Sequence, residues 1–282
     1  MKRVVGYIFW DFNKNLDKKA FEKVAKKKNI ELITFNLSED INEEKIEEKV
    51  KKCDILFNNS AEEFAIELVK TVEELGKIVV DSSETFYYTE DKWVFFLKCK
   101  ENKLSTLNTI LLSENLNLAK EELKKFDCWP VILKRVRGCS GEYVEKADNL
   151  NEAQKIIKKF WGKSSERIPI IAQEFVSSPS YRITTIGDKI VQTAIKEGTG
   201  WKHTGVFGNR FKKLKIDKDL KNLINKTIKI MKINICGIDL LKKDNKWVLL
   251  EVNSSPGIDF FKNDREKLAG EILDFLVEKV NK

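Results

Sequence analysis

The sequence predicts an α/β protein in which a small open parallel sheet precedes a larger α+β region. Three observations predict this fold class. Short apolar runs rich in β-branched residues alternate with helical spacing up to about residue 85. Beyond that point, strands follow one another in hairpins with helices between them. The chain has 282 residues, of which 42% are hydrophobic, so it can bury the cores of two or three subdomains.

The amino-terminal part of the chain shows the alternation most clearly. The run 4–9 is short, apolar and β-branched, as expected of a buried strand. Helical spacing of apolar residues follows it directly. Strands are expected at 4–9, 30–35, 53–58 and 77–80, and helices at 16–28, 41–52 and 62–75. This order predicts a small sheet of the doubly wound kind over residues 1–85.

The pattern changes after Asp81. Extended segments are expected at 109–112, 128–136, around 143–144, and at 168–175, 181–186, 189–195, 235–241 and 247–252; helices are expected at 91–100, 151–161, 219–232 and 265–280. Gly187-Asp188 and Asp244-Asn245 are typical of tight turns between paired strands. This part of the chain is therefore expected to contain antiparallel hairpins.

The charge balance is basic, with 52 Lys and Arg against 44 Asp and Glu and a net charge of +8. Much of the excess is lysine scattered along helical stretches, as at 26–28, which is typical of a solvated surface. Aromatic residues are not interleaved with the basic clusters, so no nucleic-acid partner is expected. The balance favours anionic ligands such as nucleotides and polycarboxylates.

Cysteine and histidine usage excludes two further classes of protein. The five cysteines are odd in number, none are in C-x-x-C spacing, and there is one histidine. A disulfide framework and a zinc site are therefore not expected. A cytoplasmic location is expected. The first apolar run stops at Asp11, which is too short to span a membrane and has no small-residue cleavage site behind it, so no membrane segment is expected.

The most specific motif is at the carboxyl end, where Gly237-Ile238-Asp239 precedes Glu251-Val252-Asn253-Ser254-Ser255-Pro256-Gly257. Glu251 and Asn253 are two apart on one strand and share a sheet face. Asp239, on the paired strand, can face the same side. Two carboxylates and an amide oxygen form a hard site that suits Mg²⁺. The alternative is an exposed polar hairpin face, but Asn followed by Ser-Ser-Pro-Gly favours the metal site.

A second motif joins an apolar strand to a glycine loop. The run 130–134 ends at Lys134, which can reach phosphate oxygens as a point charge. Gly138 and Gly141 free the next segment to fold over phosphate with its backbone N–H groups. Taken alone, this motif also fits an ordinary hairpin turn with a solvated lysine.

Two weaker motifs carry less information by themselves. Lys92 lies at the head of a helix behind Glu90 and Asp91, which are plausible N-cap residues, and a surface lysine is the default interpretation. The segment 173–176 could serve as an adenine hinge, whose backbone pairs with the base edge, or could simply end a buried strand.

In this order along the chain, the motifs resemble the ATP-grasp superfamily, and most closely its RimK-like carboxylate–amine (glutamate) ligases. The likeness covers about residues 85–282. It implies an ATP-grasp fold with a pre-ATP-grasp domain at 1–85, a small lid subdomain at 86–165 and a carboxyl-terminal subdomain with the metal site at 166–282. It also implies formation of an amide through an acyl phosphate, with an amino acid such as glutamate added to an acidic acceptor.

The resemblance assigns roles to individual positions. ATP and Mg²⁺, or Mn²⁺ in its place, are the implied cofactors, and small-molecule or peptide carboxylates and amines the implied substrates. The implied residues are Asp239, Glu251 and Asn253 for two metal ions; Lys92 and Lys134 for the phosphates; Gly138, Ser140 and Gly141 for the closing loop; Gln173, Glu174, Phe175 and Val176 for adenine and ribose; and Arg182 near the acyl phosphate.

The chain departs from the family pattern where the substrates would bind. Ser180-Tyr181-Arg182 stands where Asp-Ile-Arg is usual, and Tyr143 replaces a third loop glycine. In the altered segment 199–210, Lys202 and Arg210 are candidates for binding anionic groups. His203 fits equally a substrate-orienting residue and an exposed loop residue. A kinase on the same fold and a non-catalytic ATP sensor stay open as alternatives, as does a homo-oligomer.

Overall fold

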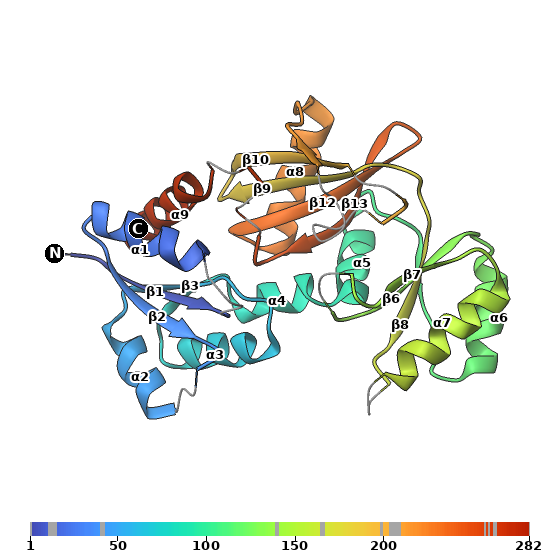
Figure 1. Ribbon diagram of the computed structural model, residues 1–282, viewed down its shortest axis with the longest axis horizontal. Helices are drawn as coiled ribbons and strands as arrows, with labels where there is room; N and C mark the ends of the chain where they lie inside the picture. Colours follow the sequence, from blue (N-terminus) through green and yellow to red (C-terminus); the bar gives the residue numbers. More distant parts are fainter. Residues whose placement is uncertain are drawn as a thin grey trace.

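The computed structural model describes residues 2–10, 16–39, 43–138, 141–163, 167–197, 200–202, 210–256, 258, 260–261 and 264–281. Within these residues the chain forms three sheets, one near each end and one between them in space (Figure 1). Each sheet is covered by helices whose apolar faces complete a separate hydrophobic core.

The amino-terminal sheet is parallel, with the strand order β2-β1-β3-β4. Its elements are β1 (Val4–Phe9), α1 (Leu16–Lys27), β2 (Glu31–Asn36), α2 (Glu43–Lys52), β3 (Ile55–Asn58), α3 (Glu63–Glu74) and β4 (Ile78–Val80). Successive residues of β1 point to opposite faces, and both faces are buried: Tyr7 contacts the core under α1, and Ile8 the core under α2 and α3. The predicted doubly wound sheet is therefore confirmed.

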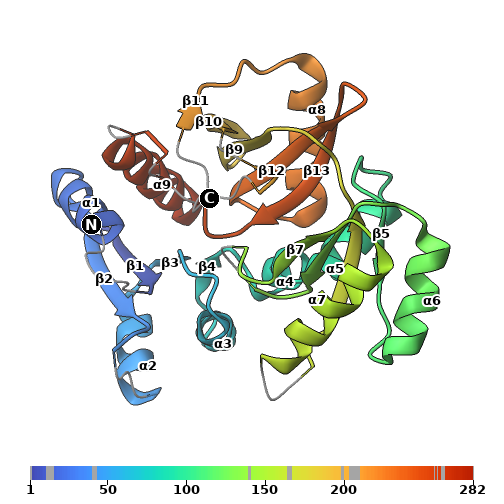
Figure 2. The same cartoon turned by 45° about the vertical axis from the view of Figure 1, so that its right-hand side comes forward.

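The last helix, α9 (Arg265–Val280), belongs to the amino-terminal sheet in space. It packs beside α1 and shares one hydrophobic core with β1 and α1 (Figures 1 and 2). Two ion pairs join these helices at 2.7 Å, one from Arg265 to Asp17 and one from Lys28 to Asp274. The amino-terminal domain thus depends on the carboxyl end of the chain to cover its sheet.

The second sheet along the chain, called the middle sheet from here on, lies at one end of the molecule in space (Figure 1) and is antiparallel, with the order β5-β8-β6-β7. Its strands are β5 (Thr109–Leu111), β6 (Val131–Arg135), β7 (Val144–Ala147) and β8 (Ile170–Glu174). Helices α6 (Leu116–Phe126) and α7 (Leu150–Gly162) cover one face and form a core with it. Because β8 pairs with β5 and β6, this sheet extends past residue 165, where the expected division of the chain placed a boundary.

The third sheet is also antiparallel, with the order β11-β10-β9-β12-β13. Its strands are β9 (Ser180–Ile186), β10 (Lys189–Glu197), β11 (Arg210–Lys212), β12 (Ile235–Lys243) and β13 (Lys246–Asn253). Helices α5 (Lys92–Glu101) and α8 (Lys218–Met231) contribute to the core on one face. The polar residues of the sheet lie on the opposite face, as described below.

Helix α4 (Ser83–Thr89), which the sequence pattern did not reveal, leads from the amino-terminal sheet towards α5. Just before it, the buried carboxylate of Asp81 accepts hydrogen bonds from the backbone N–H groups of Asn234 and Ile235 and from the side chain of Asn234. This contact fixes the end of β4 to the start of β12. The first and third sheets are therefore joined by hydrogen bonds to one side chain.

Candidate active site

The predicted metal set lies together on one face of the third sheet. Asp239 on β12 is directly opposite Glu251 on β13. The amide of Asn253 lies 3.4 Å from oxygens of both carboxylates. A β-bulge follows this pair, so that Leu240 faces Leu249 and Leu250 is the extra residue. The bulge lets Leu249 face the core under α8 while Glu251 faces the site.

Two buried cations neutralise Asp239. The Lys196 ammonium lies 2.7 Å from Asp239 Oδ1, and Nε of Arg182 lies 3.2 Å from the same oxygen. Burial by itself would raise the pKa of Asp239, but Arg182 and Lys196 hold it below its usual value, so the carboxylate is charged. Nη1 of Arg182 is buried and has no hydrogen-bond partner within the described part of the chain. It lies against Gly237 and is a donor that an anionic ligand would satisfy.

The face of the middle sheet that carries Lys134 is turned away from α6 and α7. Lys134 on β6 alternates with Leu133, which contacts the helices, and its Nζ donates to Gln173 Oε1 on β8 at 2.7 Å. Gln173 in turn donates through Nε2 to Thr109 Oγ1 at 3.0 Å. Burial lowers the pKa of Lys134 to about 8, and the charges of Glu251 and Lys92 also act on it. The structure therefore brings Lys134 into the electrostatic field of the metal set.

The glycine loop after β6 is held by two lysines. Lys92 at the start of α5 donates through Nζ to the Gly138 carbonyl at 2.9 Å. Lys202 donates to the carbonyls of Gly141 and Val144, and burial lowers the pKa of its ammonium. Both lysines can exchange these carbonyls for phosphate oxygens. Ser140, His203 and the Arg210 side chain lie outside the described residues.

The expected hinge, residues 173–176, begins at the end of β8, and its Phe175 and Val176 line a cavity of about 420 Å³ together with Trp201. The Phe175 ring meets the Trp201 ring edge to face, with 6.5 Å between the centroids. The backbone N–H of Phe175 donates to the Pro130 carbonyl. No backbone bond of Val176 N–H is found among the described residues, so this group is free to pair with a base edge. The Glu174 carboxylate is engaged elsewhere, because it accepts from Lys243 at 2.7 Å and from Asn108 at 3.0 Å.

Sequence reasoning missed Lys196, Glu90 and Asn59. The partly buried Glu90 accepts from Ser254 Oγ at 2.6 Å, and desolvation raises the pKa of its carboxyl. Asn59, next to the end of β3, lies 3.2 Å from Ser255 Oγ. These contacts fix the loop after Asn253 to α4 and to the amino-terminal sheet. Of the three, only Glu90 had a local signal in the sequence, because the run Glu90-Asp91-Lys92 suggested it as an N-cap residue.

The residues present fit Mg²⁺. Two carboxylates and one amide supply hard oxygen donors, and a rotated Asn253 amide would present its oxygen to an ion. In the described residues no group of three His, Cys, Asp or Glu side chains forms a metal cluster. Such a sparse donor set suits an ion that completes its shell with phosphate oxygens and water.

A family model for the RimK-like ATP-grasp domain matches residues 89–276. The chain belongs to this family. In the RimK-like domain, the matched residues run from the end of α4 into α9 and include all of the metal set and the hinge. The prediction of a RimK-like ATP-grasp protein is confirmed.

Two curated relatives of this RimK-like chain share a name. A protein from Saccharophagus degradans named probable alpha-L-glutamate ligase is 25% identical over 215 residues, which are 74% of this chain and 70% of that protein. A protein of the same name from Coxiella burnetii is 31% identical over 153 residues, or 52% of this chain and 50% of that one. The alignments thus span between half and about 70% of these relatives.

Solved structures with this fold extend the match to the whole chain. The D-alanine–D-alanine ligase from Bacillus anthracis has a TM-score of 0.75 at 15% identity and covers 100% of this chain and 98% of its own. A RimK domain protein from Sphaerobacter thermophilus has a TM-score of 0.74 at 13% identity, with coverage of 97% and 99%. The ATP-grasp fold, preceded by a small parallel sheet, is therefore confirmed.

Proposed function

We propose that this protein is an ATP-dependent carboxylate–amine ligase that forms an amide through an acyl phosphate and adds an amino acid such as glutamate to an acidic acceptor. One observation carries the proposal: the metal set Asp239, Glu251 and Asn253 converges on one sheet face. Arg182 and Lys196 lie beside it, and its charges act on Lys134. Family membership and the ligase names of the relatives support the same class. This agrees with the enzyme class predicted from the sequence.

The nucleotide would lie between the middle and third sheets. We place adenine against the segment 173–176, where Phe175 and Val176 line a cavity. Lys92 and Lys134 would bind phosphate oxygens, and the loop from Gly138 to Gly141 would close over them. Asp239, Glu251 and Asn253 would hold Mg²⁺, or Mn²⁺ with the same hard donors, which neutralises phosphate charge when bound.

In the first step a substrate carboxylate oxygen attacks the γ-phosphorus, the bond to the β-phosphate oxygen breaks, and ADP leaves. Lys134 offsets the charge on the phosphoryl oxygens. In the second step an amine attacks the acyl carbon, the carbon–oxygen bond breaks, and inorganic phosphate and a proton leave. Arg182 would stabilise the oxyanion through Nη1, which has no partner among the described side chains.

The reaction needs positioning and charge rather than a covalent bond to the protein. Lys202, which now bonds carbonyls of the glycine loop, would help this loop to exclude water from the acyl phosphate. No helix in the described part of the chain is long and apolar enough to cross a membrane. We propose a cytoplasmic site of action, which the free state of Cys53, Cys99, Cys128 and Cys236 supports.

The test is ATP turnover with Mg²⁺ over a panel of amino acids and glutamyl peptides, with hydroxylamine present to trap acyl phosphate. Phosphate release with a hydroxamate product is expected. Asp239→Asn should abolish it, and Asp219→Asn, an exposed substitution in α8, should not. ADP formation with a stable phosphorylated product and no free phosphate would show a kinase instead.

A further inference from the structure

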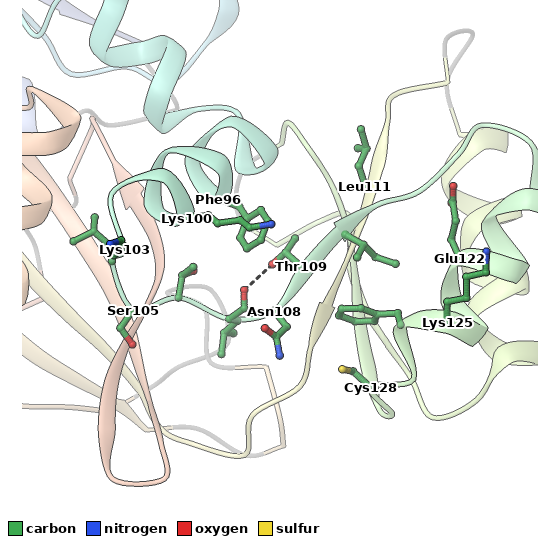
Figure 3. A pocket seen from close by; sticks show the side chains of 15 residues that line it. Phe96, Lys100, Lys103, Ser105, Asn108, Thr109, Leu111, Glu122, Lys125 and Cys128 are labelled. Atoms are coloured by element: carbon green, nitrogen blue, oxygen red, sulfur yellow. Dashed lines mark hydrogen bonds between the residues drawn. The ribbon is translucent and has the colours of Figure 1, made fainter.

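A second groove lies away from the proposed nucleotide site, between the end of α5, the strand β5 and α6 (Figure 3). Its volume is about 880 Å³, which is within the range of ligand sites. The chain from Ser105 to Leu111 runs along it, with Lys100 and Lys103 near one end and Lys125 and Glu122 near the other. The proposed function uses none of these side chains.

The floor of the groove is an unpaired strand edge. Within the described residues, β5 is the outer strand of the middle sheet and pairs with β8 alone. The Asn108 carbonyl and the Leu112 N–H bond to β8, at Glu174 and Ile170. Backbone groups alternate along an antiparallel strand, so the N–H and carbonyl groups of Thr109 and Leu111 point away from β8. They can accept and donate the hydrogen bonds of one further strand.

The charge around this edge is basic. Lys100, Lys103 and Lys125 line the groove, and none of them forms an ion pair with a residue that the structure describes. The single carboxylate, Glu122, is occupied in part, because its Oε2 accepts from the Ser113 N–H at 2.8 Å. Neighbouring lysines outside the groove differ, as Lys124 lies 2.8 Å from Glu121. The groove is therefore complementary to an anion-bearing ligand.

Apolar side chains complete the lining. Phe96 from α5 and Phe126 from the end of α6 face the groove, and Leu111 is 39% exposed beside them. An extended peptide presents its side chains to alternate sides, so one set can contact the aromatic rings while the other meets the lysines. A compact inorganic anion would use the lysines but not the strand edge or the rings.

We propose that this groove binds an extended acidic peptide segment, which adds to β5 as a further strand and pairs its carboxylates with Lys100, Lys103 and Lys125. The proposal does not depend on the ligase reaction. The groove meets the nucleotide site through Thr109, whose side chain accepts from Gln173 while its backbone faces the groove, and through Asn108, whose N–H donates to Glu174. Peptide and nucleotide therefore bind at separate places.

The test is fluorescence anisotropy of a labelled peptide that alternates Glu and Val, titrated with the full-length protein in the absence and presence of ATP and Mg²⁺. Binding is expected under both conditions, to weaken with added salt, and to be lost when Gln replaces each Glu. Two further peptides carry N-methyl groups on alternate peptide bonds, one on the odd and one on the even bonds. One of the two should fail to bind, because strand addition needs the N–H groups on one side of the peptide.

Two adjacent residues of α6 give a matched pair of variants. Lys125→Glu should weaken binding by about fivefold or more, and Lys124→Glu, with the same charge change outside the groove, by less than about twofold. The proposal would be overturned if both variants had equal effects or if ATP displaced the peptide. It would also be overturned if both N-methylated peptides bound unchanged or if no peptide bound at all. Unfolding curves that superimpose would show that both variants fold.

Discussion

Gly237 lies directly against the guanidinium of Arg182, and a Cβ atom on Gly237 would be 2.8 Å from Arg182 Cζ. The glycine of the Gly237-Ile238-Asp239 motif thus makes room for the cation that pairs with Asp239. Because the register places Gly237 beside Thr184 and Asp239 beside Arg182, the arginine lies across the strand on top of the glycine. The close approach of Arg182 explains why position 237, two residues before Asp239, is a glycine.

Gly237→Ala should displace Arg182 and lower ATP turnover by about tenfold or more, since small misplacements of charged groups are costly. The clash should also destabilise the fold by about 1–3 kcal/mol. The control is Gly162→Ala in α7, where an added Cβ meets nothing within 4 Å. It should keep full activity and gain up to about 1 kcal/mol of stability. Steady-state kinetics and urea unfolding of both variants provide the comparison, and equal activity would contradict this role of Gly237.

Lys134 should make ATP binding depend on pH. Its pKa is lowered to about 8 by burial, so the ammonium that attracts phosphate is present below pH 8 and lost above it. ATP affinity should therefore fall by up to about tenfold per pH unit above 8. For stability the sign is opposite: the unfolded chain binds more protons between about pH 8 and 10.5, so the ligand-free fold gains stability as pH rises through this window.

Calorimetric titration with ATP from pH 7 to 9.5 measures this effect. Lys134→Arg keeps its charge over the whole range, so its ATP affinity should change little with pH. A native protein with a flat profile, or a Lys134→Arg variant with the native slope, would show that another group is responsible.

Lys196→Met should lower turnover by about 10²-fold, because it removes one of two cations that hold Asp239 charged. The pKa of Asp239 should rise, since burial is then opposed by Arg182 and the hydrogen bond with Glu251 but no longer by Lys196. Lys189→Met, at the exposed start of the same strand, is the matched control and should be neutral. The pH–rate profiles of the two variants distinguish the cases: only Lys196→Met should shift the acid limb upward.

Asp81→Asn should destabilise the fold by about 2–4 kcal/mol. An amide group in place of Oδ2 would face the Ile235 N–H, which would lose its acceptor in a buried place. Asp54→Asn, where one carboxylate oxygen accepts from the Val4 N–H in a half-buried position, should cost about 1 kcal/mol. Urea unfolding of both variants measures the difference, and an equal cost would mean that Asp81 does not join the two sheets.

The sequence predicted the parts of the fold that depend on local pattern. Buried parallel strands read as apolar runs, so β1 and its neighbours were found. The apolar spacing of α9 gave its bounds as Arg265–Val280. Helix α6 was missed, although Asn115 caps it and Ala119 and Leu123 lie at helical spacing behind the cap. The packing of α9 on α1 could not be predicted, because it joins opposite ends of the chain.

The candidate site was predictable to a similar degree. Glu251 and Asn253 share a face because they are two apart on one strand, but only the bulge at Leu250 sets Asp239 opposite Glu251. Lys196 looks like an ordinary polar residue of a strand, and only the pairing of β10 with β9 and of β9 with β12 brings it to Asp239. A β-bulge between Ile190 and Gln192 shifts the register set by the Gly187-Asp188 turn, so counting from the turn would have placed the lysine on the opposite face. The contact of Glu90 with Ser254 had no such signal.

The most direct test of the proposed activation of a carboxylate by ATP is the transfer of oxygen from substrate to phosphate. A glutamyl peptide labelled with ¹⁸O in its carboxylates is incubated with the protein, Mg²⁺, ATP and unlabelled glutamate, and the released phosphate is analysed by mass spectrometry. If an acyl phosphate forms, each phosphate carries one ¹⁸O atom, because the carbon–oxygen bond breaks in the second step. Phosphate without label, released at the same rate, would contradict the account.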